Sequence, residues 1–281
     1  MKKSLSINDR VFNNLDHLKG YKAAGFDAID YTCGWGHLLR DDREEKIAKA
    51  KENLAEAGIE CYSIHMPCYN IFLQPDELND AKEEEIKRSL EMAGKLGVKW
   101  CVMHPMGTID DVHTAKWIIE KNAENAKRYL EIAEKAGTAI ALENVPHFGD
   151  CPQYVFITSI VENHLEIVEK VGSPNFQVCW DFGHQQLNIS DADKLQTVKT
   201  AAKYIRAFHF QSNYGNMDWH FAPCFGNVDW KDIVKTVYDA GYNGSFNLEV
   251  DIDRVPVDCL FEHYKLYSRM IDEIVKDAGV C

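Results

Sequence analysis

One short phrase recurs along this chain and limits how it can fold. The phrases KAAGFD (22–27), AEAGIE (55–60), GKLGVK (94–99), EKAGTA (134–139) and DAGYNG (239–244) are near copies of one another. Each has the composition of a helix C-terminus, a glycine that ends the helix, and the first residues of a strand. A chain that repeats this joint alternates strands with helices, so we expect a parallel sheet covered by helices.

Eight runs of strand character alternate with segments of helical periodicity. The runs occupy residues 4–8, 26–32, 59–65, 98–104, 138–144, 176–181, 205–210 and 244–250. Helices are predicted over 79–97 and 114–137, and each of these segments ends in glycine. Eight strand–helix units without a Pro- or Ser-rich linker predict an α/β protein with a single domain over residues 1–281, a (β/α)8 TIM barrel. An open, doubly wound sheet is the alternative, because periodicity alone does not show closure.

The composition of the chain restricts its partners and its compartment. Lys and Arg number 31 against 44 Asp and Glu, and the net charge of −13 argues against nucleic acid as a partner. The nine cysteines are an odd number without a C-x-x-C pair, so neither a disulfide framework nor a zinc ribbon is indicated. The N-terminal residues lack the pattern of an export signal, and no apolar segment reaches the roughly 18 residues of a membrane span. We expect a soluble cytoplasmic protein, with assembly into a homo-oligomer left open.

Six of the strand-like runs finish near an acid or an imidazole, residue types that a buried strand avoids. They are His65, His104, Glu143, Asp181, His209 and Glu249, with successive separations of 28 to 40 residues. One such residue alone is more often a cap or a loop-bonding group than a functional one. Because the C-terminal ends of barrel strands converge on one mouth, six at equivalent positions favour a common site.

The carboxylates in this set point to a cation. Three carboxylates packed together repel one another and have raised pKa values unless a cation lies among them. We therefore expect a divalent metal bound by Glu143, Asp181, His209 and Glu249. Such an oxygen and nitrogen set suits Mn²⁺, Mg²⁺ or Co²⁺ and permits Zn²⁺. His184, three residues after Asp181, is expected on the same rim.

A long loop after His209 (210–230) contains a second candidate pair, Asp218 and His220. In an extended segment, residues two apart face the same way, so both would reach the mouth together. The alternative is that Asp218 only holds a turn.

Two further groups are assigned structural roles. Trp100, Trp117 and Trp180 are expected to pack in the core. Cys61, Cys101 and Cys179 fall within predicted strands and are expected to be small buried hydrophobic residues.

Short motifs in this order along the chain resemble those of the xylose-isomerase-like barrel superfamily. They are HMP (65–67), VMHP (102–105), LEN (142–144), DFGH (181–184), FHF (208–210), DWH (218–220), GNVDW (226–230) and LEV (248–250). This superfamily gathers sugar isomerases and epimerases, inosose dehydratases and the endonuclease IV enzymes. By this resemblance, Glu143, Asp181, His209 and Glu249 look like the single metal site of the ketose epimerase and isomerase branch, and His184 looks like a substrate or metal contact. His65, His104, Asp218 and His220 look like the additional ligands of the endonuclease IV zinc cluster.

The segment DFGHQQL (181–187) looks more like the sugar branch, and the charge of −13 argues against DNA. We therefore expect a metal-dependent isomerase or epimerase of a sugar, a sugar phosphate or an inosose. It would act through an enediolate, with Glu143 and Glu249 as acid and base. The alternatives are an inosose dehydratase-type lyase, a multi-zinc phosphodiesterase of the endonuclease IV type, and a sugar-binding barrel without turnover. No Arg lies between His209 and His220, where ketose 3-epimerases carry one for the substrate.

Overall fold

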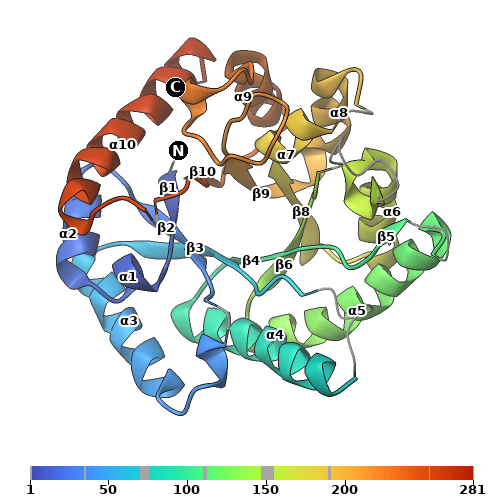
Figure 1. The fold of residues 1–281 in the computed structure, drawn as a ribbon, viewed down its shortest axis with the longest axis horizontal. Coiled ribbons are helices and arrows are strands. Elements are labelled where there is room, and N and C mark those ends of the chain that lie inside the picture. Colours follow the sequence, from blue (N-terminus) through green and yellow to red (C-terminus); the bar gives the residue numbers. More distant parts are fainter. Residues whose placement is uncertain are drawn as a thin grey trace.

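Eight parallel strands form a closed barrel (Figure 1). The computed structural model describes residues 2–34, 36–69, 76–109, 113–146, 155–188, 191–252 and 254–280. The order around the barrel is β1, β10, β9, β8, β6, β4, β3, β2. The strands are β1 (Lys2–Ile7), β2 (Ala28–Thr32), β3 (Glu60–His65), β4 (Trp100–Met103), β6 (Ala139–Glu143), β8 (Phe176–Asp181), β9 (Ile205–Phe210) and β10 (Ser245–Leu248). The predicted single-domain barrel is confirmed, and the open sheet is wrong because β10 pairs with β1.

Helices surround the barrel as an outer ring, as Figure 1 shows. They are α2 (Leu15–Ala23), α3 (Arg43–Ala57), α4 (Asp76–Leu96), α5 (Ala115–Ala136), α6 (Val161–Val171), α8 (Lys194–Ala201), α9 (Trp230–Asp239) and α10 (Leu260–Asp277). Two short helices directly follow strands, α7 (Phe182–Leu187) after β8 and α1 (Asp9–Phe12) after β1. The helices predicted over 79–97 and 114–137 correspond to α4 and α5.

The recurrent glycine joint has the conformation that its sequence predicts. Gly25, Gly58, Gly97, Gly137 and Gly241 all have a positive φ, between 68° and 99°. In this left-handed region a side chain would be strained, so glycine ends the helix and turns the chain toward the next strand.

The core has two layers. A small cluster from six barrel strands fills the barrel and consists of Ala28, Tyr62, Trp100, Val102, Ala139, Ala141, Cys179 and Ala207. A larger apolar cluster joins the strands to the helices. Cys61, Cys101 and Cys179 are buried as predicted.

Two of the three tryptophans expected in the core, Trp100 and Trp180, are buried. Trp117 is 38% exposed, so its assignment to the core is wrong. It lies in the first turn of α5, where its ring packs on that of His113 at a centroid distance of 4.8 Å.

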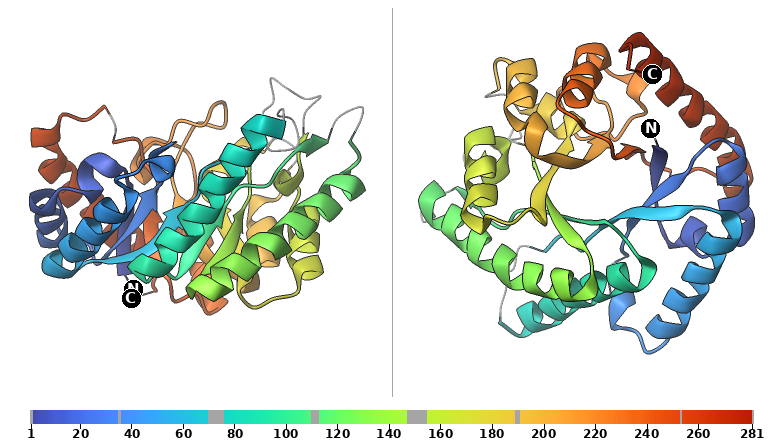
Figure 2. Two further views of the ribbon diagram at one scale, coloured as in Figure 1. Left: turned by 90° about the horizontal axis from the view of Figure 1, so that it is seen from below. Right: turned by 180° about the vertical axis from the view of Figure 1, so that it is seen from behind.

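A two-stranded ribbon lies outside the barrel and was not predicted. β5 (Thr108–Ile109) pairs antiparallel with β7 (Val155–Phe156). The left view of Figure 2 shows that the start of β1 and the segment after α10 lie at the same end of the barrel. Within the described ranges, every helix is too short or too polar to cross a lipid bilayer.

Candidate metal centre

Strand geometry directs the predicted site residues into the mouth of the barrel. Residues two apart on a strand face the same side. Val102, Ala141, Cys179 and Ala207 belong to the cluster inside the barrel, and two positions further along lie His104, Glu143, Asp181 and His209. The small side chains below therefore leave the interior open to the polar groups above them.

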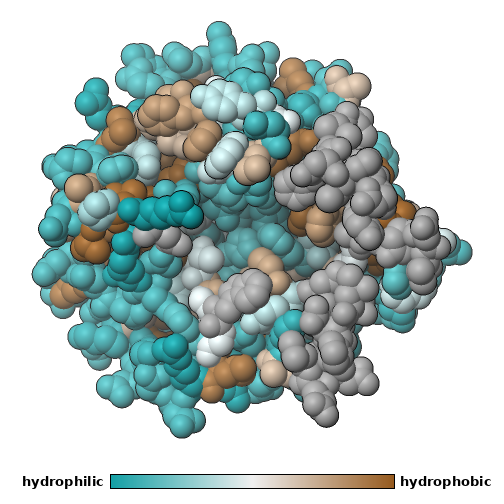
Figure 3. Space-filling model, in the orientation of Figure 1, coloured by the Kyte–Doolittle hydropathy of each residue, from teal (hydrophilic) through white to brown (hydrophobic). Residues whose placement is uncertain are grey.

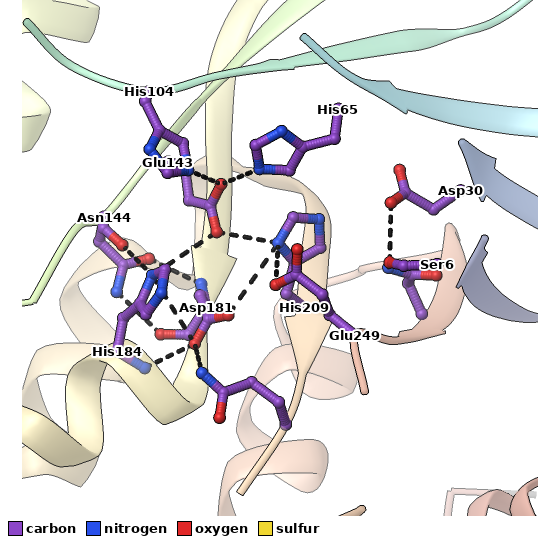
Figure 4. Close-up of polar contacts among 12 residues, drawn as sticks. Ser6, Asp30, His65, His104, Glu143, Asn144, Asp181, His184, His209 and Glu249 are labelled. Carbon is purple, nitrogen blue, oxygen red and sulfur yellow. Dashed lines mark hydrogen bonds and ion pairs between the residues drawn. The ribbon is translucent and has the colours of Figure 1, made fainter. Parts of the chain in front are cut away.

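The four predicted metal ligands lie together. Glu143, Asp181, His209 and Glu249, named here the acidic cluster, each offer one ligand atom, and these atoms all lie within 4.8 Å of one another. Nδ1 of His209 lies 2.8 Å from Oε1 of Glu143, 3.0 Å from Oε2 of Glu249 and 4.0 Å from Oδ2 of Asp181 (Figure 4). Segments more than 100 residues apart in sequence are thus brought to one point.

The two carboxylate oxygens of Asp181 have different surroundings. It is the N-cap of α7, and its Oδ1 accepts the backbone N–H of His184 at 2.6 Å. Its Oδ2 is buried and has no hydrogen-bond partner among the described residues. The spacing of Asp181 and His184 is therefore that of a helix cap, which leaves one oxygen free to face the cluster.

Glu143 connects the acidic cluster to two more of the predicted histidines. Its Oε2 lies 3.2 Å from Nε2 of His65 and 3.0 Å from Nε2 of His104. The carboxylate is fully buried, so these imidazoles and His209 surround its charge. Although burial opposes it, His209 and His104 hold the pKa of Glu143 well below its usual range.

The remaining predicted residues form a second group, the loop cluster of His184, Asp218 and His220. Nε2 of His184 and Nε2 of His220 each lie 3.1 Å from Oδ2 of Asp218. Their ligand atoms also lie within 4.8 Å of one another. Asp218 and His220 do meet, although His220 has a φ of 47° rather than extended backbone. Asp218 therefore contacts two histidines and does more than hold a turn.

Two amides that the sequence analysis did not assign fix this arrangement. Gln211 donates through Nε2 to Oδ1 of Asp181 at 3.2 Å and to Oδ1 of Asp218 at 2.8 Å, joining the two clusters. Asn144 accepts the backbone N–H of Asp181 at 2.7 Å and donates to its carbonyl oxygen at 2.8 Å. Both residues directly follow or end a predicted strand, and that position is the signal that could have identified them.

The close packing of acids and imidazoles shifts the pKa values of the site residues. Burial, opposed by His184 and reinforced by Glu249 and Glu143, raises the pKa of Asp181 to about 7. Burial alone would lower the pKa of His104, but Cys68 and Glu143 beside it raise it to about 9. A divalent cation among the carboxylates relieves their mutual repulsion. With its converging oxygens and the unpartnered oxygen of Asp181, the acidic cluster fits such an ion.

Cys68 lies near the same histidines. Its sulfur and one nitrogen each from His65 and His104 all lie within 4.8 Å of one another. Burial would raise the pKa of Cys68, but His104 and His65 lower it to about 6. By contrast, burial raises the pKa of Cys179 to about 12.

A cavity of about 220 Å³ adjoins the two clusters at Glu249 and His220. Its other lining residues are Ser6, Ile7, Asn8, Thr32, Val250, Asp251 and Ile252. Figure 3 shows that the face seen in Figure 1 is hollowed near its centre, with hydrophilic residues in the hollow. The site therefore combines converging ligands with room for a small molecule.

The motifs and the barrel agree with a comparison against protein families. The xylose isomerase-like TIM barrel family matches residues 18–266. The chain belongs to this family. A similar protein, an uncharacterized protein of Methanocaldococcus jannaschii, is 26% identical over 230 residues, which are 80% of this chain and 74% of that protein.

Solved structures share the fold over nearly the full length. A D-tagatose 3-epimerase-like protein has a TM-score of 0.78 at 22% identity and covers 99% of this chain and 98% of its own. The IOLI protein, solved with a bound zinc atom, has a TM-score of 0.73 at 19% identity and covers 99% and 98%. At these identities the likeness shows the barrel fold of the family.

Proposed function

We propose that this chain is a metal-dependent isomerase or epimerase of a small sugar, a sugar phosphate or an inosose. The observation that carries the proposal is the convergence of the acidic cluster beside a cavity. The fold shared with a 3-epimerase-like protein and with a zinc-bound protein supports it.

The acidic cluster would hold the ion. Two atoms bound to one ion at about 2.1 Å stand at most roughly 4.2 Å apart. The separations of 2.8, 3.0 and 4.0 Å around Nδ1 of His209 fall within this limit. Three carboxylates and one imidazole suit Mn²⁺, Mg²⁺ or Co²⁺ and permit Zn²⁺. When bound, a divalent cation stabilises the negative oxygen that forms as a proton leaves the carbon beside a carbonyl.

The two glutamates would move that proton. Glu249 lines the cavity with 15% of its side chain exposed, so a substrate in the cavity reaches it. Glu143 is held as the deprotonated carboxylate by the imidazoles around it, which is the form that a base requires. If one glutamate removes the proton and the other returns it to the opposite face of the same carbon, the product is an epimer. Return to the neighbouring carbon gives an isomer, and loss of a hydroxyl gives the dehydratase-type lyase reaction.

Hydrogen exchange tests this proposal directly. The protein loaded with Mn²⁺ would be incubated in D₂O with a panel of ketoses, ketose phosphates and inososes. We expect deuterium to enter one substrate at the carbon next to the carbonyl, observed by NMR. A substrate that binds without any exchange would instead identify a sugar-binding barrel.

A multi-zinc phosphodiesterase is a second candidate. The observation in its favour is that the loop cluster and the pair His65 and His104 flank the acidic cluster as further ligand groups. About three tightly held zinc ions per chain, with nicking of DNA at abasic sites, would support this function. One exchangeable ion per chain, with no nicking, would support the sugar enzyme.

A further inference from the structure

The segments between each barrel strand and the outer helix that follows it contain few basic residues. They are residues 8–14, 33–42, 66–75, 104–114, 144–160, 182–193, 211–229 and 249–259. In a (β/α)8 barrel these segments surround the active-site mouth. They hold fourteen Asp and Glu but only Arg10, Arg40 and Arg254, whereas the whole chain has 31 Lys and Arg against 44 Asp and Glu. Basic residues are therefore scarcer at this face than in the chain as a whole.

All the Lys and Arg of the chain lie within the described ranges, and none of them lines the cavity beside the acidic cluster. Arg10 donates through Nη1 to the carbonyl oxygen of Val255 at 3.0 Å and through Nη2 to that of Ile252 at 2.7 Å. The other two arginines are exposed. Apart from His220, the residues that line the cavity are neutral or acidic. An anion in the cavity would therefore lack a Lys or Arg partner.

The histidines of the mouth already contact carboxylates. Five of them have a ring nitrogen within 3.2 Å of a carboxylate oxygen of Glu143 or Asp218. They are His65, His104, His184, His209 and His220. In His184 and His220 the second nitrogen also lies within 3.0 Å of a backbone carbonyl oxygen. The N–H groups of these rings thus have acceptors within the protein, so the rings do not replace the missing basic residues.

The backbone amides after the last two strands are engaged as well. Barrel enzymes that bind a phosphate frequently do so at the loops after the seventh and eighth strands, which are β9 and β10 in this chain. The N–H of Glu249 donates to the carbonyl oxygen of Phe210 at 3.1 Å, and the N–H of Asp251 donates to that of His220 at 3.2 Å. The segment EVDID (249–253) also contains three carboxylates. A phosphate at this position would meet charges of its own sign.

We propose that the substrate of this site is an uncharged polyhydroxy compound, a free sugar or an inosose, and that sugar phosphates are excluded. The inference rests on the proposed function and narrows its substrate class. A bound divalent ion does not reverse the sign of the site, because the acidic cluster has three carboxylates and Asp218 adjoins it. Ser6, Asn8 and Thr32 line the cavity and offer hydroxyl and amide groups to a substrate hydroxyl.

Free sugars and their phosphate esters test this preference without requiring turnover. Saturation-transfer NMR would measure the binding of D-fructose, D-ribulose and their terminal phosphate esters to the full-length protein loaded with Mg²⁺. We expect each ester to bind at least about tenfold more weakly than its free sugar, because no basic residue offsets its charge. An ester that binds as tightly as its free sugar, or more tightly, would overturn the inference.

A lysine added at the rim sharpens this test. Thr32 is exposed at the end of β2 and lines the cavity. Thr32→Lys should increase the affinity for the esters on the order of tenfold. Thr200→Lys, at an exposed position of α8, makes the same change of charge away from the cavity and should have no effect. Thermal unfolding checks that both variants fold. No gain in Thr32→Lys, or an equal gain in both variants, would contradict the inference.

Hydrogen exchange in D₂O on the same samples separates this inference from the proposed function. A free sugar that binds in preference to its ester but exchanges no hydrogen would defeat the proposed function and support the charge preference. Exchange in an ester at least as fast as in its free sugar would support the isomerase or epimerase and defeat the charge preference.

Discussion

The rim of the barrel has two unlike sides. Around β6, β8 and β9, acids and imidazoles converge, and their ligand atoms lie within 4.8 Å of one another. At β1 and β2 the corresponding side chains are Ser6 and Asp30, and Oγ of Ser6 donates to Oδ2 of Asp30 at 2.8 Å (Figure 4). The 220 Å³ cavity reaches from Ser6 and Thr32 to Glu249. On one side the ligand atoms of several acids and imidazoles converge, as binding of a cation would require, whereas on the other side a single hydrogen-bonded pair borders the cavity.

Removal of the metal proposed to bind the acidic cluster should have the largest effect on activity. Dialysis against a chelator should reduce substrate hydrogen exchange to background, and addition of Mn²⁺, Mg²⁺ or Co²⁺ should restore it. Circular dichroism before and after dialysis checks that the barrel remains folded. Full activity in protein shown by mass spectrometry to be metal-free would contradict the proposed function.

Substitution of the two glutamates tests the proton transfer separately from the ion. Glu143→Gln and Glu249→Gln should each lower the turnover number on the order of 10²–10⁴-fold, because an amide cannot act as acid or base. Bound metal is counted in the same samples. Glu120→Gln, on the exposed side of α5, is the matched control. A variant that keeps full turnover with bound metal excludes that glutamate from the role.

Ser6→Ala changes the side at β1 and β2 and should act on stability. The Ser6 hydroxyl donates to Asp30 and accepts from Nδ2 of Asn247 at 2.9 Å, and all three residues are buried. Its loss leaves buried polar atoms unpaired, so the free energy of unfolding should fall by about 1–3 kcal/mol. Urea unfolding measures this change, with the exposed Thr200→Ala as control. An unchanged midpoint would show that the network is not structural.

The pH dependence of the metal-free protein gives the smallest effect. The pKa values of His104 and His220 are raised from 6.5 to about 9, mainly by carboxylates and Cys68 acting against burial. A raised histidine pKa stabilises the fold fully below about pH 6.5, and this stabilisation is lost as the pH rises through about 9. The lowered pKa of Cys68, about 6, acts in the opposite direction over this range.

The thermal midpoint of the metal-free protein should therefore fall gradually between pH 6.5 and 9. Protein saturated with metal should show a flatter profile if these histidines are ligands, because bound imidazoles are already deprotonated. An equally steep fall with and without metal would count against His104 and His220 as ligands.

The barrel and the meeting of the predicted ligands could be inferred from sequence because each depends on a local signal. The glycine joints fix where the helices stop. The alternation of side chains along a strand fixes whether the side chain of Glu143 or His209 points into the barrel. Contacts between loops leave no such signal. The ribbon of β5 and β7, the bridge made by Gln211 and the position of Cys68 depend on how separate segments pack, and no periodicity in the chain records that. The metal, the reaction and the roles of the ligands remain predictions.

The carboxylate of Asp181 has a consequence for comparing sequences within the family. One oxygen caps a helix and the other faces the cluster, so loss of this side chain would remove a helix cap as well as a cluster oxygen. In a homologue that has lost its activity, we would expect the Glu249 equivalent to be substituted before the Asp181 equivalent. Glu249 is therefore the more informative position for recognising inactive members.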